Sequence, residues 1–420
     1  MQVKILTSTI RTIIILTDIS IYKFKYLDNK IFNKNFKGDK MAVFYFETIL
    51  KVKLLGMQVT TVKINFTEDM DRNNISLGTY DFFIRSENTD NVWCKIPIVG
   101  MKWKNKRCLY LKLVNKMDYL PIKLLKLKKS PPDVFTQDCC KLEYNLQQKL
   151  PVYTKNNKSY DINTKYILKK GHKKYVEEFK SFMFKDLNYS IYVPKIKAKK
   201  HALIVWLHGA GEGGNNASNI MADKGAVTYL KKDTQYLFKG AYVLAPQSPT
   251  YWVDEFKMEE NIFLKAKRCY TKDLTELILQ IKQKYMDIDE SRIYLAGASM
   301  GGYQVLELLA ENPFLYAGAI ISCPAKIPIE ENLRVIKNNK IPIWLLHCVK
   351  DNVVPLKNTE YIYNYLKNED NTIKVTYYPK IIVQGKEINP HCVFIYMYEN
   401  LPEENGTRLF EWLSEQRRGK

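Results

Sequence analysis

The feature that most restricts the fold of this chain is a change in its hydrophobic pattern at about residue 160. Beyond this point, short and nearly continuous apolar runs alternate with stretches whose apolar residues recur at helical spacing. Strands that are buried on both faces lose the polar–apolar alternation, and intervening helices supply the crossovers of a parallel sheet. The expected strands are 202–207, 241–245, 292–297, 317–322, 342–347 and 374–378, and the expected helices are 271–285, 301–311, 358–367 and 404–416. Residues 160–420 are therefore predicted to form an α/β domain with a mostly parallel sheet flanked by helices, which opens with a β-hairpin over 183–193.

The part of the chain before this change has a different pattern. Short apolar segments with period two, such as Val62–Ile64–Phe66, are separated by polar clusters that favour turns. Short strands at this spacing predict a small antiparallel β-sandwich over residues 41–155. The polar stretch 154–159 is the expected linker, and residues 1–40 match no pattern that assigns them a structure.

The charge of the chain is unevenly distributed. Residues 1–200 carry the whole formal net charge of +21, and residues 201–420 are balanced. A basic surface could attract acidic polymers, or the lysines could reflect a composition bias on an unconstrained surface. We favour the second interpretation, and expect no nucleic-acid partner, because no nucleic-acid-binding motif accompanies the scattered lysines.

Other compositional features exclude whole classes of protein. No apolar run approaches the ~20 residues that a transmembrane helix needs, which excludes a polytopic membrane protein. The 8 cysteines are too sparse for a disulfide scaffold, and no CxxC pair predicts a zinc or thioredoxin-like site. These features favour a cytoplasmic location and leave secretion open, and they do not indicate an oligomeric state.

The strongest chemical motif is Gly-Ala-Ser-Met-Gly-Gly at 297–302. It directly follows an expected strand and directly precedes an expected helix, the context in which a G-x-S-x-G turn presents a nucleophilic serine. Such a turn forces the serine into strained backbone angles, and glycines are needed on either side because the strand and helix backbones pass close together. Ser299 is therefore the candidate nucleophile, the alternative being an incidental glycine-rich turn.

A serine hydroxyl needs a base, and the base needs a carboxylate to orient it. Of the 5 histidines, His172 and His201 are expected at the surface, and His208 and His347 are expected to be structural. His391 lies in the loop between the last strand and the final helix, where the base of a chain ordered Ser–Asp–His is found. Asp351 follows the strand 342–347 and is the candidate acid. Singly, each could be an ordinary turn or loop residue.

The negative charge that develops on a substrate carbonyl oxygen needs fixed hydrogen-bond donors. The segment His208–Gly214, with sequence HGAGEGG, follows the strand 202–207 and supplies backbone near the same edge of the sheet. The expected donors are the backbone N–H groups of Ala210 and Met300. A phosphate-binding loop is the rival interpretation, but neither GxGxxG nor GxxxxGK[ST] is present.

Taken together, these segments resemble the prolyl-oligopeptidase-like and dienelactone-hydrolase-like esterases of the α/β-hydrolase superfamily. They are particularly similar to esterases and predicted peptidases that carry an immunoglobulin-like N-terminal domain. The matching stretches are 205–216, 244–252, 270–278, 289–325, 344–355 and 391–400. The resemblance implies that Ser299 is the nucleophile, His391 the general base and Asp351 its orienting acid, with the HGAG loop forming the oxyanion hole.

The resemblance further suggests that Gly209, Gln247 and Trp252 lie at the substrate cleft, although plain packing explains Gln247 and Trp252 equally well. It also suggests that residues 41–155 form an immunoglobulin-like domain, on the weaker match of GMQVTTVKINFTEDMD (56–71). One departure is Cys348, which stands where the acid loop of the family usually has glycine.

The sequence therefore predicts a serine hydrolase that cleaves carboxylic esters of small molecules or glycans through an acyl-enzyme, with no metal or organic cofactor. A serine peptidase of the same superfamily is the first alternative. The absence of propeller-like repeats disfavours it, but fold and triad alone cannot separate ester from amide cleavage. The second alternative is a surface- or polysaccharide-binding protein whose hydrolase domain is vestigial.

Overall fold

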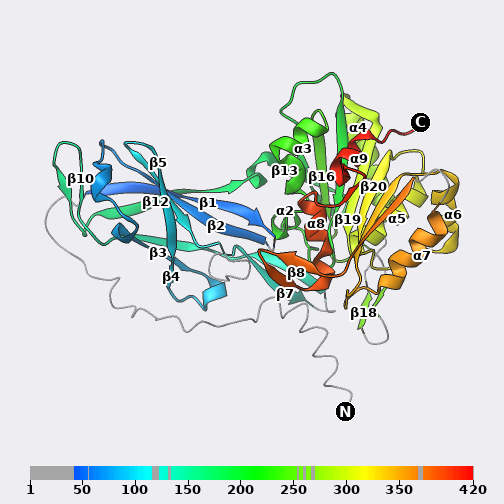
Figure 1. Ribbon diagram of the computed structural model, residues 1–420, viewed down its shortest axis with the longest axis horizontal. Helices are drawn as coiled ribbons and strands as arrows, with labels where there is room; N and C mark the ends of the chain where they lie inside the picture. Colours follow the sequence, from blue (N-terminus) through cyan, green and yellow to red (C-terminus); the bar gives the residue numbers. More distant parts are fainter. Residues whose placement is uncertain are drawn as a thin grey trace, which may run out of the picture. The chain divides into compact units, whose positions relative to one another are not determined.

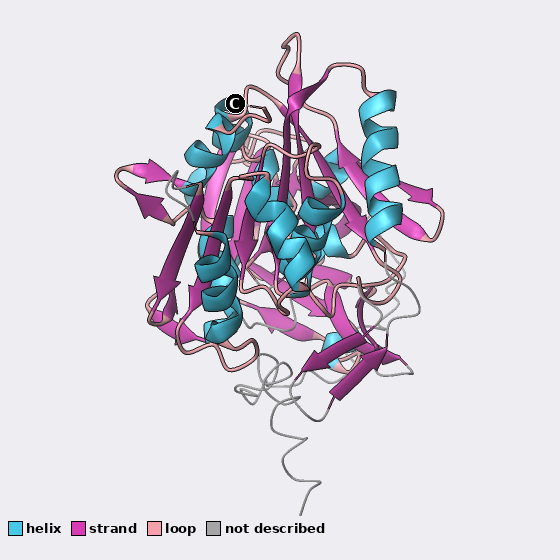
Figure 2. Cartoon of the chain, turned by 90° about the vertical axis from the view of Figure 1, so that its right-hand side faces the viewer, coloured by secondary structure: helices cyan, strands magenta, loops and turns pink. Residues whose placement is uncertain are grey.

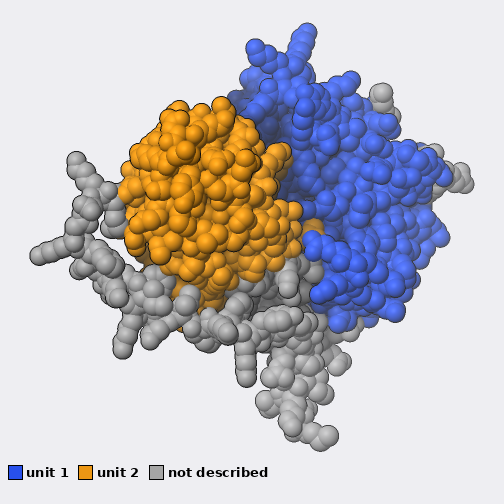
Figure 3. Space-filling model, turned by 60° about the vertical axis from the view of Figure 1, so that its left-hand side comes forward, with its two compact units in different colours: residues 1–10, 127–138, 178–420 blue, residues 11–126, 139–177 orange. Residues whose placement is uncertain are grey.

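The structure is a computed structural model that describes residues 42–54, 56–115, 123–130, 134–252, 255–258, 262–265, 270–367 and 372–419. Within these residues the chain divides into two compact units, coloured separately in Figure 3. Unit 1 takes 127–130, 134–138 and 178–419, and unit 2 takes 42–126 and 139–177. We describe each unit by itself. The predicted unassigned segment 1–40 lies outside the described residues.

Unit 1 is built on an eight-stranded, mostly parallel sheet (Figure 1). In sheet order its strands are β13 (Phe179–Phe184), β14 (Leu187–Tyr192), β16 (Ala241–Gln247), β15 (His201–Leu207), β19 (Ile288–Ala298), β20 (Gly318–Ser322), β21 (Ile343–Cys348) and β22 (Ile373–Tyr378). From β16 to β22 all neighbours are parallel, and β14 is antiparallel to both of its neighbours. Because the central strands are parallel, their carboxyl ends meet at one edge of the sheet.

Helices cover both faces of this sheet (Figure 2). Leu203, Leu295 and Leu345 belong to the buried cluster on one face, with apolar side chains of α4 (Thr271–Lys284), α5 (Met300–Glu311), α6 (Glu330–Asn338) and α7 (Leu356–Leu366). The alternate residues of the same strands lie on the other face, where Trp206 packs on α8 (Phe394–Tyr398) and Trp344 on α9 (Leu409–Glu415). Burial on both faces explains why the strands read as continuous apolar runs. The predicted α/β fold is therefore confirmed.

Two local predictions for unit 1 are wrong. The last helix was expected over 404–416, but it begins only at Leu409 because Glu403–Glu404 and Thr407–Arg408 pair as a short hairpin, β25–β26. The turn of this hairpin contains Asn405 and Gly406, both at positive φ. Positive φ at both residues is typical of a tight hairpin turn and is not compatible with an α-helix. His201 was expected at the surface, yet it is buried at the start of β15.

Several shorter elements of unit 1 were not predicted. They are α2 (Asn219–Ala222), α3 (Lys232–Leu237), the hairpins β17–β18 (Glu255–Met258 and Ile262–Lys265) and β23–β24 (Ile381–Val383 and Lys386–Ile388), and the 3₁₀ turn η8 (Pro390–Val393). Helix α6 was also missed, although its buried Leu333 and Ile336 are spaced as one helix face. None of these elements alters the order of the main sheet.

Unit 2 is all-β in its regular structure apart from single 3₁₀ turns. Its larger sheet has the order β12 (Lys165–Lys174), β1 (Val43–Lys53), β2 (Gly56–Asn65), β6 (Cys108–Leu113) and β5 (Ile98–Asn105). Its smaller sheet has the order β4 (Cys94–Ile96), β3 (Tyr80–Arg85) and β9 (Glu143–Gln148). The rings of Phe46 and Phe82 meet edge to face between the two sheets, with centroids 6.4 Å apart. The unit is thus a β-sandwich, and its immunoglobulin-like character stays a prediction.

The sandwich differs from the sequence prediction in two respects. Strand β12 lies beyond the predicted boundary at 155–160 and pairs in parallel with β1, so that unit 2 extends to Glu177 and is not purely antiparallel. The predicted linker 154–159 is instead part of a hairpin in which β10 (Val152–Tyr153) pairs with β11 (Ser159–Tyr160). The parallel strand could not be recognised because half of its residues are lysines and most are exposed, with sequence KYILKKGHKK.

Among the described residues, no helix has both the length and the apolar character needed to cross a bilayer.

Candidate active site

Ser299 sits in the tight turn between β19 and α5, with φ 55° and ψ −118°. This backbone conformation is costly for a residue with a side chain, and a hydrogen bond from the Ser299 N–H to the Ser322 carbonyl (2.9 Å) helps hold it. A Cβ at Gly297 would lie 2.5 Å from the Gly301 carbonyl oxygen, and one at Gly301 would lie 2.1 Å from the Leu207 oxygen. Glycine is therefore required at both positions, for the steric reason expected from the sequence.

Asp351 and His391 approach Ser299 from two other segments. Asp351 lies in the loop after β21, where its Oδ1 accepts hydrogen bonds from the N–H groups of Val353 (2.8 Å) and Val354 (2.9 Å). Its other oxygen, Oδ2, is 2.9 Å from His391 Nδ1, and His391 Nε2 is 3.2 Å from Ser299 Oγ. The fold thus brings these three predicted residues into one hydrogen-bonded chain.

The pKa values of Asp351 and His391 are set by burial and by the groups that contact them. Burial acts to raise the pKa of Asp351, but hydrogen bonds from His347, His391 and the Val354 N–H more than offset it, and the pKa lies well below its ordinary value. Burial acts to lower the pKa of His391, while the Cys323 sulfur and the Asp351 carboxylate raise it, and the net direction is upward. The aspartate is therefore ionised and can hold the imidazole N–H in place.

His347 contacts the carboxylate of Asp351. Its Nε2 is 3.1 Å from the Val354 carbonyl oxygen and 3.4 Å from Asp351 Oδ2, so that this nitrogen must carry the proton. Its Nδ1 then accepts from the Thr359 hydroxyl at 2.6 Å. The side chain is fully buried, which agrees with the structural role expected for it.

His208 is also structural, as expected. Its Nδ1 is 2.8 Å from the Gly209 carbonyl oxygen and its Nε2 accepts from the Ser248 N–H at 3.2 Å. Burial lowers the pKa of His208 to about 4, so that the ring is neutral at pH 7.

Comparison with known proteins agrees with the fold of unit 1. Residues 189–384 match the phospholipase/carboxylesterase family. A thermostable esterase of known structure is 26% identical and superposes with a TM-score of 0.74, covering 89% of this chain and 99% of its own. Unit 1 has the α/β-hydrolase fold, and most of it matches this family. The hydrolase domain is unit 1.

Two further structures match more weakly. An acylaminoacyl peptidase from Pyrococcus horikoshii is 14% identical with a TM-score of 0.39, covering 86% of this chain and 62% of its own. An acetyl xylan esterase from Aspergillus awamori is 17% identical with a TM-score of 0.33, covering 46% of this chain and 82% of its own.

The HGAG loop of the hydrolase domain lies beside the serine. A Cβ built on Gly209 would be 3.8 Å from Ser299 Cβ and 3.6 Å from the Ala298 oxygen. The Gly209 N–H is already donated to Glu212 Oε2 at 3.2 Å. Within the described part of the chain, no hydrogen bond occupies the N–H groups of Ala210 or of Met300, the first residue of α5. These two donors therefore have no partner among the described residues.

Sequence reasoning missed the acidic support of this loop. Glu212 lies beside Asp223, whose Oδ2 accepts from the Tyr398 hydroxyl at 2.6 Å and whose Oδ1 accepts from the Gly225 N–H at 2.7 Å. Burial raises the pKa of both carboxyl groups, and the charge of Asp223 raises that of Glu212 further. The only signal in the sequence was a glutamate inside the HGAGEGG motif.

Two of the predicted substrate contacts, Gln247 and Trp252, are packed against the HGAG region. Gln247 is fully buried, and its amide donates to the Glu212 carbonyl (2.9 Å) and the Ser218 hydroxyl (3.1 Å). Trp252 is fully buried too, and its indole N–H donates to the His208 carbonyl at 2.9 Å. Both side chains therefore support the backbone of the HGAG region, and their contact with a substrate stays a prediction. Gly209, which lies beside Ser299, stays a predicted contact.

Proposed function

We propose that the hydrolase domain is a serine esterase in which Ser299, His391 and Asp351 act as a catalytic triad. The observation that carries the proposal is the chain of two hydrogen bonds, 3.2 Å from Ser299 Oγ to His391 Nε2 and 2.9 Å from His391 Nδ1 to Asp351 Oδ2. This geometry satisfies the requirement for a nucleophile within reach of a base that a third group orients.

In the first half of the reaction, Ser299 Oγ attacks the ester carbonyl carbon while its proton passes to His391 Nε2. The ionised Asp351 accepts the Nδ1–H hydrogen bond and stabilises the imidazolium that forms. The carbonyl oxygen, now negative, takes hydrogen bonds from the Ala210 and Met300 N–H groups. The ester C–O bond then breaks, and His391 returns its proton to the leaving alcohol.

In the second half, water attacks the acyl group on Ser299. His391 accepts a proton from the water, the same two N–H groups stabilise the second oxyanion, and the carboxylic acid leaves as the proton returns to Ser299 Oγ. Every proton is returned, and the steps call on no residue outside this set.

An ester rather than a peptide substrate is supported by the thermostable esterase, 99% of whose chain is covered at a TM-score of 0.74. The test is turnover of para-nitrophenyl acetate by the full chain and by Ser299→Ala, with a panel of unactivated esters and peptides run beside it. We expect turnover by the full chain and a loss of several orders of magnitude in kcat for Ser299→Ala. Equal turnover by both proteins would refute the proposal, and cleavage of peptides in preference to esters would favour the peptidase alternative.

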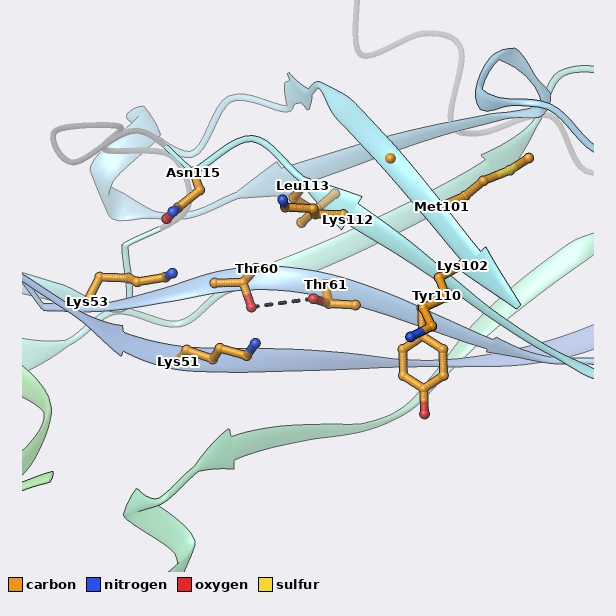
Figure 4. A pocket seen from close by; sticks show the side chains of 11 residues that line it. Lys51, Lys53, Thr60, Thr61, Met101, Lys102, Tyr110, Lys112, Leu113 and Asn115 are labelled. Carbon is orange, nitrogen blue, oxygen red and sulfur yellow. Dashed lines mark hydrogen bonds between the residues drawn. The ribbon is translucent and has the colours of Figure 1, made fainter. Parts of the chain in front are cut away.

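A second function, binding of an anionic polymer, is favoured by one feature of unit 2. A pocket of about 390 Å³ lies on the outer side of the larger sheet, and its lining residues include four lysines and no carboxylate (Figure 4). The lysines are Lys51, Lys53, Lys102 and Lys112, which come from strands β1, β5 and β6. Burial lowers the pKa of Lys51, and the charges of Lys174 and Lys112 lower it further. A bound anion would relieve this repulsion.

This second proposal can be tested by retention of the full chain on an anionic polysaccharide column. We expect the double variant Lys51→Gln/Lys112→Gln to elute at a clearly lower salt concentration than the full chain without substitutions. The matched control is Lys141→Gln/Lys149→Gln, which removes the same charge from exposed sites of unit 2 outside the pocket. Equal shifts in the two variants would mean that net charge alone causes retention.

A further inference from the structure

Cys323 occupies a central position that the proposed mechanism does not use. It directly follows β20, which lies between β19, the strand that ends at Ser299, and β21, the strand that precedes Asp351. Its N–H donates to the Leu346 carbonyl at 2.7 Å, and its φ of 38° is unusual for a residue with a side chain. The side chain is fully buried. The fold thus holds a thiol at the carboxyl edge of the sheet, between the nucleophile and the acid.

This thiol forms a cluster with two residues of the site. Cys323 Sγ, a carboxylate oxygen of Asp351 and an imidazole nitrogen of His391 all lie within 4.8 Å of one another, the one such group of three potential ligands among the described residues. Cys323 Sγ is also 3.7 Å from the His391 carbonyl oxygen. The His391 side chain is 16% exposed, so that the cluster can be reached from solvent.

Thiolate, imidazole and carboxylate are the three donor types that zinc prefers in proteins, at bond lengths of about 2.0–2.3 Å. Ligands of one zinc ion therefore lie at most about 4.6 Å apart, so that small side-chain movements would suffice here. We propose that Cys323, Asp351 and His391 form a site for zinc or a similar thiophilic divalent cation, and that an ion bound there inhibits the hydrolase domain.

Inhibition follows whichever imidazole nitrogen binds the ion. Coordination by Nε2 takes the lone pair that must accept the Ser299 proton. Coordination by Nδ1 replaces the proton that is shared with Asp351, and so removes the contact that orients the ring. A chelator that removes the ion should therefore restore turnover. This effect on turnover rests on the proposed esterase function, whereas binding of the ion does not.

The experiment is a titration of the full chain with Zn²⁺ and, separately, Cd²⁺, in a background where the exposed Cys139 is replaced by serine to remove surface binding. Zn²⁺ is followed by inhibition of para-nitrophenyl acetate turnover. Cd²⁺ is followed by the ultraviolet charge-transfer band of a Cd²⁺–thiolate bond. The variants are Cys323→Ser and Cys323→Gly, the second of which suits the positive φ. The matched control is Cys392→Ser, which changes a buried thiol directly after His391.

We expect inhibition by Zn²⁺ that EDTA reverses, and a Cd²⁺ band in the full chain, in Cys392→Ser and in Ser299→Ala. Both Cys323 variants should lose that band and should need at least roughly tenfold more Zn²⁺ for the same inhibition. Replacing even a residue that only contacts a metal ligand can weaken metal binding by this factor. No band in the full chain, or an equal band in the Cys323 variants, would overturn the site. A band without any esterase turnover would instead remove the proposed function and leave the site standing.

Discussion

The two units of this protein use polar side chains in opposite ways. The hydrolase domain gathers its polar groups at strand ends, where Ser299, Cys323 and Asp351 follow three adjacent parallel strands. Unit 2 instead spreads lysines over the outer faces of its strands, and some of them line its pocket. Residues 201–420 carry no net charge, although they contain all three proposed catalytic residues. Net charge therefore did not indicate where the chemistry lies.

The reason lies in the geometry of the sheets. Parallel strands bring their carboxyl ends to one edge, so that residues far apart in the chain can meet in a partly buried site. There, low polarity strengthens each interaction and shifts pKa values. Charges on the outer face of the larger sheet of unit 2 stay in contact with water and are screened, so that each one contributes little. The following predictions test this contrast, from the largest expected effect to the smallest.

The first prediction compares two ion-paired aspartates, one in each unit. Asp351→Asn should lower kcat for para-nitrophenyl acetate by about 10⁴-fold, because an amide cannot hold the imidazole in the tautomer that accepts the Ser299 proton. Asp81→Asn removes the partner of Lys95 in unit 2, 2.7 Å away, and should leave kcat within about twofold. A similar loss of kcat in both variants would contradict the difference that we describe between the two units.

The second prediction compares two glycines. Gly301→Ala places a Cβ 2.1 Å from a backbone oxygen, and should destabilise the hydrolase domain by about 3 kcal/mol or more. Gly100→Ala in unit 2 meets only ordinary contacts at 3.7 Å and should change stability by less than about 1 kcal/mol. Hydrogen exchange followed by mass spectrometry reports the two units separately. Unchanged protection of α5 in Gly301→Ala would contradict the account of this turn.

The third prediction concerns Glu212 behind the HGAG loop. Glu212→Ala removes the acceptor of the Gly209 N–H and should lower kcat by roughly 10- to 100-fold, because the oxyanion donors lose their fixed position. Glu212→Gln keeps a neutral group of the same shape and should retain most of the activity. Equal losses would instead indicate that a charge at this position takes part in the reaction. KM for a small ester should change little in either variant.

The fourth prediction is a pH profile. His391 must be neutral to accept the serine proton, and its pKa is raised above the ordinary 6.5. Activity is therefore lost as pH falls through this raised value, so that the acidic limb of kcat/KM should have its midpoint above pH 6.5. A midpoint at or below 6.5 would mean that the Asp351 carboxylate does not stabilise the imidazolium as described.

The sequence was sufficient for the parts of the molecule in which local pattern and fold agree. The continuous apolar runs predicted the parallel strands of the hydrolase domain, and the helical spacing between them predicted α4, α5 and α7. The glycines at 297 and 301 predicted the turn at Ser299, since no other residue fits there. The positions of Asp351 and His391 after their strands indicated that they would meet Ser299, and the distances bear this out.

Features that depend on distant contacts could not be predicted. Strand β12 is held by pairing with β1, more than a hundred residues earlier in the chain, and its own sequence resembles an exposed loop. The hydrogen bonds of Gln247 and Trp252 to the backbone of the HGAG region depend on side-chain direction, which sequence does not reveal. The same holds for Cys323, whose position beside His391 follows only from the order of the strands.

The most direct test of the central claim is the site and rate of covalent labelling by a fluorophosphonate, which needs an activated serine. Intact mass and peptide mapping should show one adduct on the full chain, located at Ser299, and labelling of His391→Ala should be slower by several orders of magnitude. An unlabelled full chain, an adduct on another serine, or equal labelling of His391→Ala would show that these three side chains do not work as one unit.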